Sequence, residues 1–524
     1  MIHSKESKSS TLKTMIEQFN AARKAKAPIV AIRTPDPAST IRRIRTVFDN
    51  GQNPIAEWDV VGGLRHVNEL CRVHCANANK VKVEDILLDG DPSMITGNPV
   101  EALRRAVTFL PDNTIMFFHN GHMFVEQGSG DGHKPVIQSV WNLRDPFRRT
   151  GRTFTMLGHD IQVPAEIKHD VLVIDEPLPS DDELAAIVVQ GLRGIGMTKP
   201  LPALLGKVVD AVAGLAAFNA EQVVLMAANP MTGDIDVENA WHNKIQIIEQ
   251  DKSLKVFRGG NTFADIGGNE NLKALLSNIV NGKRCPRLVV FIEEIDTLSS
   301  ADTESSGTTM DQVKQLCVKM QDNGWDGLIL YGFPGTAKSE LAKAFGNEAG
   351  CATIQADLGG MKSKWVGSSE ARFRSFIKIV EGMSNNSDRV FFIATCNKVA
   401  NLRPEFKRRF RKGIAFSDLP DRAEKDQIWK LKLKRYELDP KMLKPDDTNW
   451  TGAEIDVCCA NAAEFGISLI EASRFMTSVS QAMGKDVENI RQAASGKFMS
   501  AHRSGVYTYS STKAFFANMM GGQT

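Results

Sequence analysis

The sequence predicts an α/β protein with two modules, each a parallel sheet flanked by helices and followed by a helical lid. Two observations predict this class. Residues 327–345 read as a buried strand, a glycine-bearing turn and an amphipathic helix. Residues 28–48 repeat that order of strand, turn and helix, and three further segments repeat in the same sequence order. Repetition over four segments predicts two copies of one module.

The composition indicates a soluble intracellular protein. The chain has 524 residues, 42% of them hydrophobic and 24% charged, which allows about three to four domains. A net charge of +2 supplies no global field that would attract nucleic acid or a membrane surface. Eight cysteines form no paired framework, the N-terminus is polar, and no apolar run reaches the length of a membrane span. We therefore expect a cytoplasmic protein with reduced thiols.

The first copy has lost the residues that bind phosphate. Aligned without a gap, Pro35 falls on Pro334, Ala38 on Ala337 and Thr40 on Ser339. Arg33, Asp36 and Ser39, however, stand where the second copy has glycine, glycine and lysine. An aspartate repels a phosphate, so this copy is predicted not to bind nucleotide.

The repeat sets the expected domain boundaries. Residues 115–120, 152–157 and 163–184 resemble residues 289–294, 389–394 and 403–425. We predict a degenerate module over residues 1–180, its alanine-rich helical lid over 181–250, an active core over 251–424 that opens with a linker, and a C-terminal helical lid and tail over 425–524. His119, His122, His133 and His159 lack a cysteine or acid cluster that would complete a metal site, so we expect them at strand ends and loops.

The second copy keeps a phosphate-binding loop. Backbone N–H groups converge at the start of the helix, Lys338 can reach the terminal phosphates, and the Ser339 hydroxyl can bind Mg²⁺. Glycine usually precedes this lysine; because Ala337 is expected in the first helical turn, the change should cost little. The alternative is a glycine turn that binds nothing. The predicted nucleotide-binding residues of the loop are Gly332, Pro334, Gly335, Thr336, Ala337, Lys338, Ser339 and Glu340.

An acidic strand end supplies the candidate hydrolytic residues. Four apolar residues lead into Glu293 and Glu294, which we assign to Mg²⁺ and to the attacking water. Aspartate is usual at the first position, so Glu293 is one methylene longer. The alternative is a solvated strand end. Asn397, at the tip of a later strand, could orient water near the γ-phosphate.

These motifs resemble those of the AAA+ ATPases over residues 263–462. The shared segments are Asp265–Gly268, GFPGTAKS, FIEEID, KWVG, ATCN, the arginines of RRF and the lid segment 451–462. The tandem plan, with its degenerate first module, resembles plastid and cyanobacterial AAA proteins of uncharacterised function and phage relatives. The resemblance implies ATP and Mg²⁺ as cofactors and a homo-oligomeric ring, expected to be a hexamer.

Further residue roles follow from the same resemblance. Asp265, Ile266 and Gly267 would contact nucleotide. Arg408 and Arg409 would stabilise the transition state in a neighbouring subunit, with Arg411 as the next choice; the alternative for this basic run is a solvated face. The predicted pore loop that grips a protein substrate is Lys364, Trp365, Val366 and Gly367, and the alternative for the tryptophan is a packing role.

One departure from the family pattern is large. The acidic strand precedes the phosphate loop here, whereas in the family it follows the pore-loop helix. We interpret this as a local permutation that keeps the strand in its usual place in the sheet. The favoured function is an ATP-hydrolysing remodelling ring. The alternatives are an ATP-gated scaffold with little turnover and a nucleic-acid motor, which the near-neutral charge disfavours.

Overall fold

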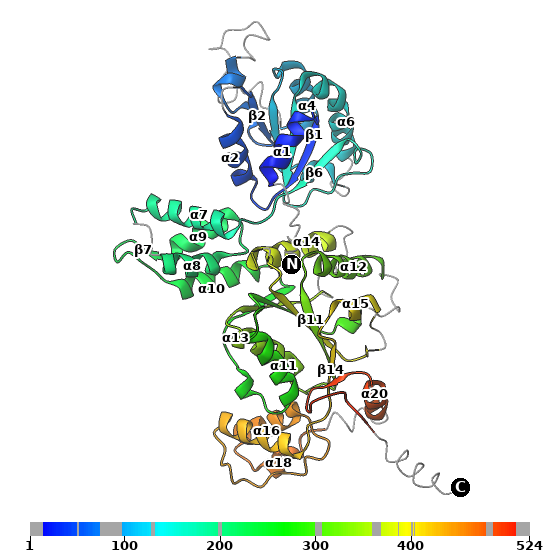
Figure 1. The fold of residues 1–524 in the computed structure, drawn as a ribbon. Helices are drawn as coiled ribbons and strands as arrows, with labels where there is room; N and C mark the ends of the chain where they lie inside the picture. Colours follow the sequence, from blue (N-terminus) through cyan, green and yellow to red (C-terminus); the bar gives the residue numbers. More distant parts are fainter. Residues whose placement is uncertain are drawn as a thin grey trace, which may run out of the picture. The chain divides into compact units, whose positions relative to one another are not determined.

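The protein divides into two compact units, residues 1–201 with 215–233 and residues 202–214 with 234–524. The structure is a computed structural model (Figure 1). The residues that the structure describes are 14–49, 52–73, 97–126, 132–197, 202–298, 306–358, 368–385, 387–399, 402, 404–477 and 486–509.

The first unit contains a six-stranded sheet in the order β3-β2-β4-β5-β1-β6. The β2–β3 pair is antiparallel and the other pairs are parallel. Its strands are β1 (Ile29–Arg33), β2 (Ile55–Asp59), β3 (Gly63–His66), β4 (Ile115–Phe118), β5 (Thr153–Gly158) and β6 (Val171–Asp175).

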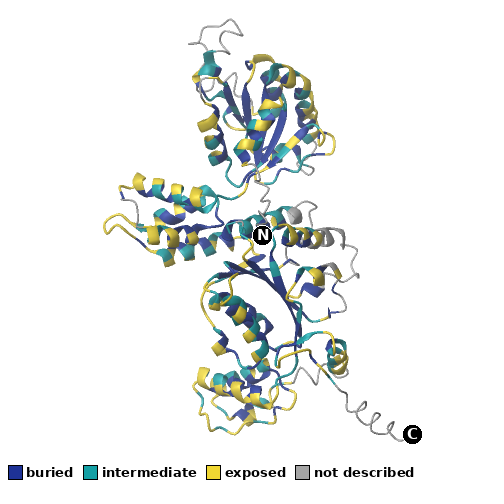
Figure 2. Ribbon diagram, viewed as in Figure 1, coloured by how far each residue is buried: buried dark blue, intermediate teal, exposed yellow. Residues whose placement is uncertain are grey.

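Helices bury apolar side chains against both faces of this sheet. Helices α1 (Met15–Lys24) and α2 (Pro37–Phe48) pack on one face, where Phe19 and Ile44 are fully buried. Helices α4 (Pro99–Phe109) and α6 (His133–Thr150) pack on the other, and the short α5 (His122–Val125) contacts α6. Figure 2 shows the buried strands between helices whose outer faces are exposed.

The second unit contains a seven-stranded sheet in the order β15-β14-β11-β13-β10-β12-β9. Only the β9–β12 pair is antiparallel. Its strands are β9 (Leu254–Phe257), β10 (Leu288–Ile292), β11 (Asp326–Gly332), β12 (Ala352–Ala356), β13 (Val390–Cys396), β14 (Ile414–Ser417) and β15 (Met499–Ser500).

The helices around the second sheet follow the predicted pattern. They are α11 (Glu270–Val280), α12 (Ser306–Asp322), α13 (Lys338–Glu348), α14 (Ser368–Met383) and α15 (Pro404–Arg409), with the 3₁₀ turns η2 (Phe263–Asp265) and η3 (Ile295–Leu298). Helices α11 and α13 share one core cluster with β10, β11, β13 and β14. The mixed α/β fold with largely parallel sheets is confirmed.

The two sheets have the same order over their corresponding strands. Read in one direction, the first sheet runs β3-β2-β4-β5-β1-β6 and the second β9-β12-β10-β13-β11-β14. The predicted internal repeat is thereby confirmed for the strands. β10 lies between β12 and β13, as β4 lies between β2 and β5, although β10 precedes β11 in the chain. The acidic residues after β10 and the phosphate loop after β11 therefore both lie at the carboxyl ends of the parallel strands.

The predicted linker is wrong in part, because residues 254–257 form the edge strand β9. Leu254 and Val256 are buried whereas Lys255 is exposed, the alternation of a half-buried strand. β9 pairs antiparallel with β12. The charges and glycines that indicated a linker flank this short strand.

The described residues of the range 181–250 form helices α7, α8, α9 and α10 and the short strands β7 (Ala228–Asn229) and β8 (Asp234–Ile235). Helices α7 (Asp181–Gly194) and α9 (Ala217–Ala227) belong to the first unit, and α8 (Pro202–Val212) and α10 (Val237–Ile248) to the second. That this region acts as the lid of the first module stays a prediction.

The region predicted to form the C-terminal lid, called the lid below, contains among its described residues α16 (Arg422–Arg435), α17 (Gly452–Phe465) and α18 (Leu469–Ser473). The side chains of Trp429, Trp450 and Ile455 form its own core. After the lid, α20 (Asp486–Ala494) leads back to the sheet, where β15 pairs with β14. Among the described residues, no helix is both long enough and apolar enough to span a membrane.

Candidate nucleotide site

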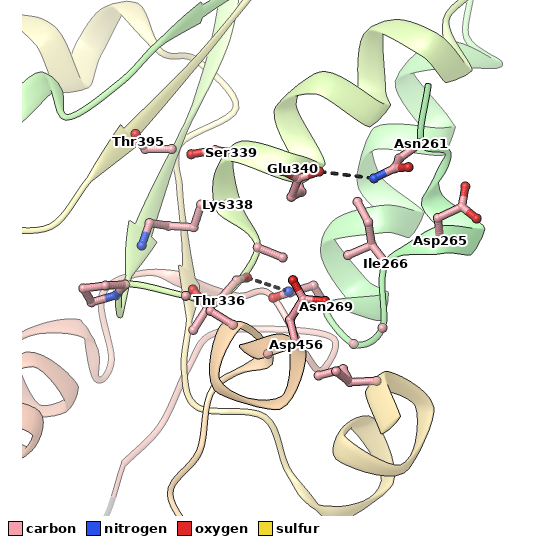
Figure 3. A pocket seen from close by; sticks show the side chains of 18 of the residues that line it. Asn261, Asp265, Ile266, Asn269, Thr336, Lys338, Ser339, Glu340, Thr395 and Asp456 are labelled. Atoms are coloured by element: carbon pink, nitrogen blue, oxygen red, sulfur yellow. Dashed lines mark hydrogen bonds between the residues drawn. The ribbon is translucent and has the colours of Figure 1, made fainter. Parts of the chain in front are cut away.

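A cleft of about 1290 Å³ lies where the second sheet meets the lid (Figure 3). It brings together side chains from the phosphate loop, the acidic strand end, the tip of β13 and the lid. The predicted residues that line it are Asp265, Ile266, Gly267, Glu293, Glu294, Pro334, Gly335, Thr336, Ala337, Lys338, Ser339, Glu340 and Asn397. Gly332, Arg408 and Arg409 are not among its lining residues.

Two glycines of the phosphate loop are required by close contacts. Gly332 has φ 150°, and a Cβ there would lie 2.1 Å from the Ser417 carbonyl oxygen. Gly335 has φ 80°, and its Cβ would lie 2.6 Å from the Thr451 hydroxyl of the lid. The backbone N–H of Ala453 also donates to the Gly335 carbonyl at 3.2 Å. The loop and the start of α17 therefore contact each other directly.

Ala337 does not lie in the first helical turn, so that expectation is wrong. It is the N-cap of α13 and has φ 61° and ψ 22°, a left-handed conformation. An L-residue with a Cβ holds this conformation at a cost of roughly 1–2 kcal/mol, which glycine avoids. The missing glycine of the sequence pattern therefore has a conformational cost.

The side chain of Lys338 is buried beneath the phosphate-binding loop. Its Nζ donates to the carbonyl oxygens of Gly332 at 2.8 Å and Phe333 at 2.6 Å. Burial lowers the pKa of Lys338 to about 8, although the nearby charges of Asp296 and Glu294 oppose that shift. An ammonium has three donors, so one remains for a phosphate oxygen.

The two glutamates after β10 have different environments. Glu293 Oε2 accepts a hydrogen bond from Gln355 Nε2 of β12 at 2.7 Å. Glu294 has φ 46°, a strained conformation for a glutamate, and its N–H donates to the Thr395 hydroxyl at 3.0 Å. Asn397 Nδ2 lies 3.4 Å from Glu294 Oε1. Glu294 and Asn397, which are predicted to act on the attacking water, therefore lie close together just beyond the carboxyl ends of β10 and β13.

Two buried polar residues were not predicted from the sequence. Asp296 accepts from the backbone N–H groups of Asn397 at 3.1 Å and Lys398 at 3.0 Å, and so fixes the tip of β13. Asn269 donates to the Thr336 carbonyl at 3.2 Å and accepts from the Ser417 hydroxyl at 2.7 Å. The FIEEID motif includes Asp296, but no sequence signal indicated Asn269.

The Asp265–Gly267 segment faces the lid. Asp265 accepts from the N–H and the hydroxyl of Thr262, both at 2.8 Å, and these bonds lower the pKa of its carboxyl group. A Cβ at Gly267 would lie 2.6 Å from Ile428 Cγ1 and 2.9 Å from the Ile428 backbone nitrogen of α16. The segment therefore sets how closely α16 approaches the cleft.

The predicted transition-state arginines lie on α15, away from the cleft of their own chain. Arg408 is exposed, whereas Arg409 is half-buried. Arg411 donates to the Gly324 carbonyl at 3.0 Å and lies 3.7 Å from Asp326. The predicted pore loop, residues 364–367, lies outside the described residues.

In the first unit, protein side chains occupy the position that corresponds to the phosphate-binding site. Asp36 caps α2 by accepting from the Ser39 N–H at 3.0 Å, and its second oxygen accepts from the Phe218 N–H at 3.2 Å. His119 Nε2 lies 3.2 Å from Glu57 Oε2. A carboxylate thus takes the position where a helix N-terminus would otherwise attract phosphate.

The cleft fits a nucleoside triphosphate with a divalent cation. Its volume exceeds what such a ligand needs, and the loop presents glycines, a helix N-terminus and a lysine. The hydroxyl of Ser339 and the carboxylate of Glu293 are oxygen donors of the kind that Mg²⁺ prefers. Fold and site together have the features of a P-loop nucleotide-binding protein.

Two segments of the chain match family models. Residues 15–176 match the model for the SpoVK-like AAA ATPase, N-terminal domain, and residues 328–384 match that for the ATPase family associated with various cellular activities (AAA). Both matching models describe AAA ATPases, so the chain is similar to that family over these two segments.

Several proteins are similar to this chain. The "Uncharacterized AAA domain-containing protein ycf46" of Guillardia theta is 23% identical over 89% of this chain and 90% of its own length. Its counterpart in Gracilaria tenuistipitata var. liui is 23% identical over 68% of this chain and 75% of its own length. Human "Vacuolar protein sorting-associated protein 4A" is 26% identical over 21% of this chain and 34% of its own length.

Proposed function

We propose that the protein is an ATPase whose second module hydrolyses ATP to ADP and phosphate. The observation that carries this proposal is the convergence of Lys338, Glu294 and Asn397 in one cleft, although they come from separate segments of the chain. If the acidic strand β10 lay elsewhere in the sheet, Glu293 and Glu294 would not lie near the phosphate loop. The match of residues 328–384 to the AAA ATPase model supports the same chemistry.

Each side chain has a role that follows from its position. Lys338 binds the terminal phosphates, and Ser339 and Glu293 would hold Mg²⁺. The cation, when bound, neutralises phosphate charge. Glu294 polarises the attacking water, and Asn397 orients that water through its contact with Glu294.

Two variants test this proposal. Lys338→Ala should lose ATP binding, because it removes the charge that pairs with the phosphates. Glu294→Gln should still bind ATP but release phosphate at least about 100-fold more slowly, the typical effect of a general base. Calorimetry and a steady-state phosphate-release assay provide the measurements. Near-normal hydrolysis by Glu294→Gln would refute the assignment.

We further propose that subunits assemble into a ring and that Arg408 or Arg409 acts on the neighbouring subunit's ATP. The exposure of Arg408 outside its own cleft supports this geometry. Mixing Arg408→Ala with Lys338→Ala subunits should then restore part of the activity. If Arg408→Ala and Arg409→Ala both hydrolyse ATP normally, the proposal fails.

The proposed work of the ring is remodelling of a protein substrate, with Trp365 as the gripping residue. The similarity to human "Vacuolar protein sorting-associated protein 4A", a name that refers to protein sorting, supports a protein substrate. Trp365→Ala should abolish substrate-stimulated hydrolysis and leave basal hydrolysis and assembly intact. Loss of folding or assembly in that variant would instead indicate a packing tryptophan.

An ATP-gated scaffold with little turnover is the second candidate function. Two observations favour it: the strained Ala337 in the phosphate loop, and the hydrogen bond that ties Glu293 to Gln355. The scaffold predicts ATP-dependent assembly with a phosphate-release rate that the Glu294→Gln substitution barely changes. The hydrolysis assay therefore separates the two candidates.

A further inference from the structure

The segment after the lid returns to the nucleotide module and packs beside the cleft. β15 extends the sheet by pairing with β14, and the Ala501 N–H donates to the Phe416 carbonyl at 2.9 Å. The Ala501 carbonyl accepts from the Leu272 N–H at 3.0 Å, which satisfies a donor in the first turn of α11. These bonds fix His502, the next residue, at the cleft wall.

The two ring nitrogens of His502 both face oxygen acceptors. Nδ1 lies 2.6 Å from Glu424 Oε1, and Nε2 lies 3.2 Å from the Asp418 carbonyl oxygen. An ionised carboxylate and a carbonyl can only accept, so only the doubly protonated imidazolium donates to both. Burial alone would lower the pKa of His502, but the hydrogen bond and charge of Glu424 raise it above the ordinary value.

Glu424 continues this chain of hydrogen bonds toward the phosphate loop. Its Oε1 also accepts from the backbone N–H of Asn269 at 3.0 Å. The Asn269 side chain then donates to the Thr336 carbonyl at 3.2 Å. Glu424, Asn269 and Thr336 are all buried, so water competes little for these bonds. This series of hydrogen bonds connects the segment after the lid, helix α16 of the lid and the phosphate loop within one module.

We propose that His502 is a positioning residue that holds the phosphate loop through Glu424 and Asn269, so that its protonation strengthens ATP binding. This inference rests on the proposed ATP site. It assigns a role in that site to a segment that no predicted motif reaches. The C-terminal tail then acts as an internal clamp on the loop and the lid.

Other charged groups near His502 are already paired. The Asp418 carboxylate lies 2.8 Å from Arg491 Nε and accepts from the Tyr507 hydroxyl at 2.7 Å. Asp421, at the start of α16, lies 3.2 Å from Arg503. Glu424 is therefore the carboxylate that bonds the imidazole directly, and the carboxylate of Asp418 acts on it at longer range.

His502→Gln tests the inference because glutamine is neutral at every pH yet can donate one hydrogen bond. ATP affinity should fall about tenfold at pH 6.5, the factor expected for losing one charged hydrogen bond. The ratio between wild type and variant should shrink toward one as the pH rises through the His502 pKa. Below that pKa the imidazolium is present, and above it the neutral ring offers one donor, as glutamine does.

The comparison by ratio removes other titrations. Burial lowers the pKa of Lys338 to about 8, and because this lysine is present in both proteins its titration affects both affinities alike. Kinetics should show a raised KM for ATP with little change in kcat. Arg503→Ala is the matched control: it removes a neighbouring, mostly exposed charge that the hydrogen-bond chain does not include, and should leave ATP affinity within twofold.

The outcomes distinguish the two proposals. If wild-type protein does not bind ATP, the proposed function fails. If it binds ATP and His502→Gln gives the same affinity across the pH range, the inference fails. Asn269→Gly removes the hydrogen bond from the Asn269 side chain to the Thr336 carbonyl, and glycine tolerates the left-handed φ of 59° at this position. This variant should therefore also weaken ATP binding. Normal affinity in that variant would contradict the inference even if His502→Gln did not fold.

Discussion

Ala337 shows how one residue can alter a familiar loop. The residue before Lys338 lies in the left-handed region, where the sequence pattern normally has glycine. The sequence revealed the substitution but not the conformation, because the first turn of a helix and its N-cap differ by one position. The distinction decides whether alanine is neutral or strained there.

Ala337→Gly should raise the free energy of unfolding by about 1 kcal/mol, because glycine removes the left-handed strain. Urea titration of the nucleotide-free protein measures the change. The matched control is Ala349→Gly, at the end of the same helix, where φ is −75° and glycine relieves nothing. Equal or lower stability in Ala337→Gly would contradict the strain assigned to that position.

The residues that carry the inference could not be predicted from local pattern. Asn269, Glu424 and His502 lie far apart in the sequence and meet only through the tertiary fold. By contrast, Lys338, Ser339 and Glu294 follow directly from apolar strands that lead into polar tips. Local signals thus predict groups at strand ends and miss the buried bonds that hold those groups in place.

At the level of elements, the lid and the phosphate-binding core make contacts with little free space. Gly267 lies against Ile428 of α16, and Gly335 lies against Thr451 at the start of α17. Side chains larger than hydrogen at either glycine would separate the lid from the loop. Both sides of the cleft therefore depend on glycine.

Gly267→Ala should weaken ATP binding about tenfold, because overpacking by one methyl typically costs 1–3 kcal/mol and the clash involves backbone. Calorimetry measures the affinity. Gly206→Ala provides the control, since a Cβ there would meet nothing within 4 Å. Unchanged affinity in Gly267→Ala would mean that the lid can move away without affecting the site.

The strands of the repeat were predictable, whereas β2, β3 and the edge strands β9 and β15 were not. The strands of the repeat and the helix after each turn follow from apolar runs and helical periodicity. β9 and β15 are short and lie in polar surroundings, so their strand character depends on pairing with β12 and β14. The position of β10 in the sheet agrees with the prediction, whereas its origin by permutation stays a prediction.

At the level of the whole molecule, two modules of the same sheet order carry different site residues. The second presents Lys338 and two glutamates to a large cleft. The first presents Asp36, whose carboxylate caps the helix that would otherwise attract phosphate. The proposal of one ATP site per chain follows from this difference.

The nucleotide retained by the Glu294→Gln protein tests that proposal most directly. After incubation with ATP and Mg²⁺ and removal of free nucleotide, the bound nucleotide is identified and counted per chain. We expect about one nucleotide per chain, recovered as ATP, because Lys338 binds it and the substituted glutamine cannot activate water. Two nucleotides per chain, none, or recovery as ADP would contradict a single hydrolytic site that depends on Glu294.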